Sequence, residues 1–201
     1  MKKMILTVAA VFALGLAQAQ DSDKGQGFAK GSLYLSGTVN ISNESTGDFK
    51  TDSFTIAPGM GYFLTDNLAI EGALGYTSGN NFEEYLGNVY EVENSGVGIN
   101  AGVKYFWTPA NKFSLSLGGN LSYASIKTEV TGLGDYTSKV FGINVPVGLH
   151  YFVSDSFAIT STWGGLGYSS NDNGGNGADK TDTFSLGLDM SAINFGLIYK
   201  L

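Results

Sequence analysis

Apolar and polar residues alternate through most of the chain after residue 31, and this period of two limits the folds that the chain can adopt. Between residues 32 and 42, every odd-numbered residue is apolar or Gly, and every even-numbered residue is Ser, Thr, Asn or Tyr. Such alternation is typical of a β-strand with one apolar and one polar face. The pattern begins again near residues 54, 68, 97, 113, 141, 157 and 193, which predicts eight strands. The apolar parity slips between Met190 and Ile193, which predicts a β-bulge near Ser191, and the pair Gly164-Gly165 indicates another.

The connections between these strands alternate in length. Three are short, at residues 64–67, 108–112 and 153–156, and four are long and polar, at residues 42–53, 77–95, 125–137 and 169–183. In an antiparallel meander, this order places every short turn at one end of the sheet and every long loop at the other. The same asymmetry is found in outer-membrane barrels.

A repeated motif brings other β folds into consideration. Tyr-Phe followed by a polar turn occurs at Tyr62, Tyr105 and Tyr151, and the spacings of 43 and 46 residues also suit propeller blades. Each interval holds only two long strands, however, whereas a blade needs four. A soluble sandwich would expose the second face of its strands, but this chain has 29 Gly and only 14% charged residues, against about 25% in soluble domains. A closed barrel fits better, with the apolar face toward lipid and the small polar face filling a narrow interior.

The first residues predict export. Lys2 and Lys3 precede an apolar run at residues 4–16, which is shorter than the ~20 residues of a membrane-spanning helix. Residues 17–19 (Ala-Gln-Ala) have the small-x-small pattern of a signal-peptidase site. We therefore expect a cleaved signal peptide at residues 1–19, a short N-terminal segment at residues 20–30 and a barrel domain at residues 31–201.

Composition excludes several classes of partner and modification. The chain has no Cys, so neither a lipid anchor on Cys nor a disulfide can form. Its formal net charge is −7, and loss of Lys2 and Lys3 with the signal peptide makes it −7 − 2 = −9. An acidic chain of this kind repels polyanions, so nucleic acid is excluded as a partner.

The alternating strands, the Gly-Tyr-Phe-Leu-Thr-Asp-Asn sequence at residues 61–67 and the final strand resemble the OmpA/OmpX-type family of small outer-membrane β-barrels. The resemblance covers residues 31–201. It implies an eight-stranded antiparallel up-and-down transmembrane β-barrel in the outer membrane of a Gram-negative cell. The last strand also resembles the signal read by the barrel-assembly machinery, carried by Asn194, Gly196, Tyr199 and Leu201, although Phe is the commonest last residue in the family.

Two charged residues fall on the inward-facing parity of consecutive strands. Glu71 and Lys104 each lie a few residues from a short turn, and isolated charges in a narrow interior would be costly. We expect them to form an interior ion pair that helps to plug the barrel. The alternative is that each of them meets water or another polar group.

The Tyr-Phe motif predicts the inner rim of the barrel. Four tyrosines have the lipid-facing parity at the lower ends of strands, where an aromatic girdle meets the membrane interface: Tyr62, Tyr105, Tyr151 and Tyr199. The neighbouring Phe63, Phe106 and Phe152 have the opposite parity. They are expected to point inward beside the turns and to close the barrel floor.

The sequence offers little for catalysis. His150 is the one His, and no Cys is present, so neither a metal cluster nor a Cys nucleophile is available. His150 has the inward parity next to a short turn, which is the periplasmic end by topology, whereas catalytic barrels of the family place their reactive residues near the outer rim. We expect a packed interior His rather than a general base, and therefore no enzyme activity, no cofactor and no bound metal.

Acidic residues gather in the long loops, as with Glu83, Glu84, Glu91 and Glu93. They either bridge divalent cations to lipopolysaccharide, form an adhesive surface, or only keep the loops soluble. The resemblance implies a structural or surface-interaction role: envelope integrity, adhesion or defence against host factors. The alternatives are a small-solute or ion pore, which eight strands disfavour, and an outer-membrane lipid-modifying enzyme. Expected partners are outer-membrane lipid and lipopolysaccharide, the barrel-assembly machinery, and host or surface ligands of the loops, with the protein itself a monomer.

Overall fold

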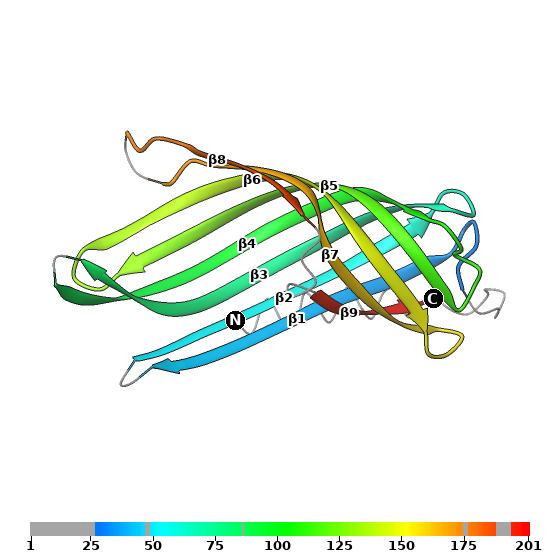
Figure 1. Ribbon diagram of the computed structural model, residues 1–201, viewed down its shortest axis with the longest axis horizontal. Coiled ribbons are helices and arrows are strands. Elements are labelled where there is room, and N and C mark those ends of the chain that lie inside the picture. The colour runs from blue at the N-terminus through cyan, green and yellow to red at the C-terminus, as the bar shows by residue number, and fades with distance from the viewer. Residues whose placement is uncertain (1–26, 47–48, 86, 175–176, 188–193) are drawn as a thin grey trace.

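The computed structural model describes residues 27–46, 49–85, 87–174, 177–187 and 194–201. In this part of the chain, β-strands form one antiparallel sheet (Figure 1). The strands are β1 (Leu33–Thr46), β2 (Phe49–Phe63), β3 (Leu68–Tyr85), β4 (Asn88–Phe106), β5 (Phe113–Val130), β6 (Gly134–Phe152), β7 (Phe157–Asn171), β8 (Thr181–Gly187) and β9 (Asn194–Lys200). The described residues include no helix that is long and apolar enough to cross a membrane. The expected signal peptide at residues 1–19 lies outside the described residues.

The sheet closes into the expected barrel. Strands β1 to β7 each pair with the next, and β9 pairs with both β7 and β1. Strand β8 pairs with the outer half of β7, whereas β9 pairs with its inner half. Because β8 and β9 follow each other along the same neighbour, they are the two parts of the eighth strand, and the eight-stranded antiparallel barrel is confirmed. The bulge expected near Ser191 lies outside the described residues.

The two faces of the barrel have the predicted chemistry. The large apolar residues of the alternating pattern are exposed around the outside, where a bilayer would cover them: Met60, Ile70, Leu74, Ile99, Val103, Leu117, Leu121, Ile143, Ile159 and Leu197 are all between 40% and 58% exposed. The opposite faces carry Ser, Thr, Asn and Gly. Eight strands leave an interior that side chains fill.

Three of the four predicted long loops are wrong. Most of residues 42–53, 77–95 and 125–137 belongs to strands that continue beyond the apolar alternation. Strands β3 and β4 remain paired from Leu68↔Tyr105 out to Tyr85↔Asn88, and β5 and β6 remain paired out to Val130↔Gly134. A polar hairpin in water satisfies its backbone groups by pairing just as a membrane strand does, so the loss of apolar alternation did not mark the end of the strand. The fourth connection has a loop between β7 and β8. All the outer hairpins extend from one end of the barrel (Figure 1).

A β-bulge occurs at Gly164–Gly165, as expected. Pro146 of β6 is opposite Gly165, but the next residue, Val147, is opposite Trp163, so Gly164 is the additional residue. Pro146 has no N–H to donate to the sheet, and Pro within a sheet is confined to edges and bulges. Gly165 has a φ of +118°, and a Cβ at this position would lie 1.9 Å from the carbonyl oxygen of Val145.

We predict that Gly165→Ala lowers the thermal unfolding temperature of the protein in detergent micelles. The strained backbone alone should cost roughly 1–3 kcal/mol, and the clash with Val145 adds to this. Gly37→Ala is the control, because a Cβ at Gly37 meets no atom within 4 Å. Equal unfolding temperatures for the two variants would contradict this account of the bulge.

Candidate functional site

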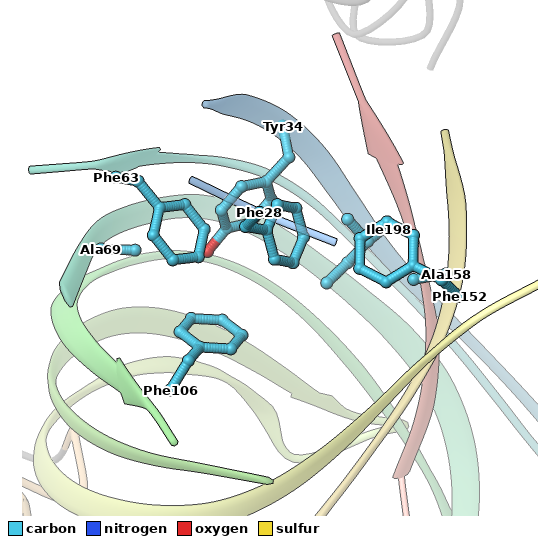
Figure 2. Packing of buried hydrophobic residues seen from close by; sticks show 8 residues of the cluster. All are labelled: Phe28, Tyr34, Phe63, Ala69, Phe106, Phe152, Ala158 and Ile198. Atoms are coloured by element: carbon cyan, nitrogen blue, oxygen red, sulfur yellow. The ribbon is translucent and has the colours of Figure 1, made fainter. Parts of the chain in front are cut away.

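The inner end of the barrel, where the short turns lie, is filled by aromatic rings. Phe63, Phe106 and Phe152 are the last residues of β2, β4 and β6, and each is at most 1% exposed. The rings of Phe63 and Phe106 are 5.0 Å apart between centroids. These three residues close the floor as the alternation predicted (Figure 2).

A fourth ring comes from the segment that precedes β1. Phe28 is 2% exposed, and it lies among the floor residues in Figure 2. Its ring centroid is 4.7 Å from that of Phe63, 4.9 Å from that of Phe152 and 5.6 Å from that of Phe106. Aromatic pairs at these separations are favourable beyond the area that they bury. Phe28 therefore fills the centre of the floor.

Backbone contacts hold this segment across the mouth of the barrel. The N–H of Phe28 donates to the carbonyl of Pro109 at 2.7 Å, and the N–H of Lys30 donates to Asp66 Oδ1 at 3.1 Å. On the opposite side, Lys200 Nζ donates to the carbonyl of Gly27 at 2.9 Å. The segment is thus tied to two different short turns and to the last strand.

The inward-facing charges lie immediately beyond this floor. Lys104 Nζ is 2.8 Å from Glu71 Oε2, and the two side chains are 14% and 16% exposed, so the structure brings the two predicted residues together. The hydroxyl of Tyr34 donates to Glu71 Oε1. Space for the Tyr34 ring exists because Gly61 has no side chain: a Cβ there would lie 2.1 Å from Tyr34 Cζ.

His150 packs inside the barrel near the same end. It is 1% exposed, its Nε2 is 2.8 Å from Ser116 Oγ, and its ring lies 4.7 Å from that of Phe106. The other ring nitrogen, Nδ1, has no hydrogen-bond partner among the described residues. A Ser–His pair that acts in acyl transfer needs a third group to orient the His and an approach for the substrate. This pair has neither the acidic partner at Nδ1 nor an exposed face.

The remaining predicted residues lie at the inner rim. Tyr62, Tyr105 and Tyr151 are between 42% and 45% exposed on the outer face, and the ring of Tyr199 is 4.8 Å from that of Phe157. Of the residues in the expected assembly signal, Asn194, Gly196 and Tyr199 belong to β9. Leu201 ends the chain, and its N–H donates to the carbonyl of Leu33 at 2.9 Å.

Sequence reasoning missed Phe28 and Tyr34. Phe28 precedes the first alternating strand, so no periodicity indicates which way it points. Tyr34 did carry a signal, because it is the one aromatic residue on the polar face of residues 32–42. A large ring on that face predicts contact with another inward-facing group.

Comparisons with known proteins agree with this architecture. A model of the outer membrane protein beta-barrel domain matches residues 6–191. The N-terminal β-barrel domain of Pseudomonas aeruginosa OprF is 12% identical with a TM-score of 0.51, over 87% of this chain and 100% of that one. OprG from Pseudomonas aeruginosa is 13% identical with a TM-score of 0.51, over 90% and 99% of the two chains. Neisserial surface protein A is 18% identical with a TM-score of 0.47, over 84% and 97%. No curated protein sequence matches the chain.

We predict that Lys104→Met lowers the thermal unfolding temperature more than the double change of Lys104→Met with Glu71→Gln. The single change leaves the Glu71 carboxylate without its cation in a narrow interior, which should cost on the order of 3 kcal/mol. The double change removes both charges and leaves an amide oxygen to accept from Tyr34.

Lys127→Met provides the matched control, because Lys127 pairs with Asp135 at 3.4 Å in an exposed hairpin. An exposed pair contributes little to stability, so this change should leave the unfolding temperature nearly unaltered. If the single and double changes at the interior pair have equal effects, the pair does not stabilise the barrel.

Proposed function

Because the chain belongs to the family of the outer membrane protein beta-barrel domain, we propose that it is a non-enzymatic barrel with a filled interior that supports the envelope and presents its outer hairpins to surface ligands. The family and the fold place the protein in the outer membrane of a Gram-negative cell. Its role in that membrane depends on two features, the interior of the barrel and the outer hairpins.

The filled inner end is the observation that carries the proposal. Phe28 and its three neighbouring phenylalanines occupy the mouth, and the contacts between Tyr34, Glu71 and Lys104 cross the interior behind them. A diffusing solute would have to displace both layers. The interior is therefore better suited to stability than to transport.

The outer hairpins are the surface through which the proposed role would act. Strands β3 to β6 have 18 or 19 residues, whereas about 9–11 tilted residues cross a bilayer. Nearly half of each strand thus extends beyond the membrane as a paired hairpin. Such hairpins are stiffer than loops, and a preorganised surface loses less entropy when it binds.

Membrane position and assembly depend on the inner rim. We propose that Tyr62, Tyr105, Tyr151 and Tyr199 mark the inner membrane–water interface, which is where amphipathic rings gather. The last strand, with Gly196, Tyr199 and Leu201, would be read by the barrel-assembly machinery. Outer-membrane lipid and lipopolysaccharide would surround the apolar outer face of a monomer.

Burial of the Ser116–His150 pair supports the absence of enzyme activity in this proposal. Both residues are about 1% exposed and lie inside the barrel, next to the aromatic floor. A substrate would meet neither of them without opening the barrel. We therefore assign the pair a packing role.

Conductance in planar bilayers tests the filled interior. The purified protein, inserted at the single-molecule level, should show no steady current, because the floor and the ion pair block the route. An established wide porin in the same bilayers confirms that insertion is detected. A steady conductance on the nanosiemens scale would contradict the proposal and support the small-solute pore instead.

A further inference from the structure

A cavity of about 310 Å³ lies at the outer end of the barrel, between two hairpins. Pairing of β2 with β3 ends at Asp52↔Asn80, while β1 and β2 remain paired to the Thr46↔Phe49 pair and β3 and β4 to the Tyr85↔Asn88 pair. Beyond the last pair of β2 and β3, the two hairpins therefore separate. The residues that line the cavity come from both of them: Glu44, Phe49, Thr51, Phe82, Glu84 and Val89.

Aromatic rings form part of the cavity wall. The ring of Phe49, on one hairpin, is 5.0 Å from the ring of Phe82, on the other, with an angle of 53° between their planes. Phe49 and Val89 remain 45% and 48% exposed, and both lie in the hairpins past the last pair of β2 and β3. Apolar side chains left open in this way beyond the membrane indicate a surface that a partner can cover.

Two carboxylates at the cavity are available to a ligand. Neighbouring acids are already engaged, since Glu83 accepts from Asn81 Nδ2 and Glu91 accepts from Asn80 Nδ2, both at 3.4 Å. In contrast, the side-chain carboxylates of Glu44 and Glu84 have no hydrogen bond or ion pair with any other residue that the structure describes, and both residues pair with the adjacent strand through their backbones alone. The cavity thus combines apolar walls with unpaired negative charge.

This combination fits an organic cation better than a metal ion. No group of three or more His, Asp or Glu side chains in the described ranges is arranged to hold a metal. Calcium takes six to eight oxygen ligands, and phenyl rings supply none. A lysine or arginine side chain suits both the apolar wall and the carboxylates of the cavity. Its aliphatic stem can pack on the apolar wall, while its charged group can contact the carboxylates and the faces of the aromatic rings.

We propose that this cavity binds a lysine or arginine side chain of a partner polypeptide outside the cell. The volume is near the lower limit of about 300 Å³ for ligand pockets, which suits one long side chain. The exposed Phe49 and Val89 at its edge provide surface for the polypeptide that carries that side chain. The acidic net charge of the chain would attract such a partner. The inference rests on the proposed surface role and names the chemistry of the partner.

Binding of a short basic peptide to the full-length chain in detergent micelles tests the proposal. The probe is fluorescein-labelled Gly-Ser-Gly-Arg-Gly-Ser-Gly, measured by fluorescence anisotropy at low ionic strength. We expect saturable binding, and binding roughly tenfold weaker after Glu44→Gln with Glu84→Gln. The matched control is Glu83→Gln with Glu91→Gln, which removes the same two charges from acids that already have partners, and it should change affinity less than about twofold.

Three results would overturn the proposal. Equal weakening in the two double variants would mean that only the general negative field attracts the peptide. Equal binding of a peptide with neutral citrulline in place of arginine would remove the role of charge. Free butylguanidinium that binds as tightly as the peptide would assign the cavity to small cations and not to a polypeptide.

Conductance of the same samples separates this inference from the proposed function. A silent barrel that does not bind the peptide contradicts the cavity assignment alone. A conducting barrel contradicts the filled interior, whatever the peptide does.

Discussion

The bilayer offers no water to backbone N–H and C=O groups, and this constraint determines the rest of the molecule. A chain that crosses lipid in strands must pair every strand on both sides, so the last strand has to meet the first. Here β9 lies between β7 and β1, and Leu35 pairs with Tyr199 at that seam. Once the sheet is closed with eight strands, its interior is just wide enough for side chains to fill it.

The way in which this interior is filled joins the two ends of the described chain. Phe28 comes from before the first strand, and Lys200, from the last strand, donates to the carbonyl beside it, at Gly27. The floor is therefore complete only when the segment before β1 and the last strand are both in place. Behind it, Tyr34 and Lys104 both reach the Glu71 carboxylate, so the charged layer depends on three strands, β1, β3 and β4. Closure of the barrel brings these residues together, and their contacts inside the barrel in turn hold the strands in place.

The sequence alone predicted the features that follow from residue periodicity, such as the strands and their faces. It did not predict the features that depend on how separate segments meet in space. The alternation predicted the strands, their faces, the inward direction of Phe63 and its counterparts, and the parity that brings Glu71 next to Lys104. The extent of the outer hairpins was not predictable from apolar alternation, because pairing in water does not require it. Phe28 belongs to no strand, and the cavity at Glu44 arises where two hairpins separate. Neither has a signature in residue spacing.

The central claim is that the inner end is sealed by the aromatic floor, and cysteine accessibility tests it most directly. The chain has no native Cys, so a single Asn100→Cys on the inward face of β4 reports on the interior beyond the floor. In liposomes that hold the barrel in one orientation, a membrane-impermeant maleimide is added on the side of the short turns, with Ser154→Cys in a short turn as the control. A sealed floor predicts rapid labelling at position 154 and none at position 100. Labelling of both at the same rate would contradict it.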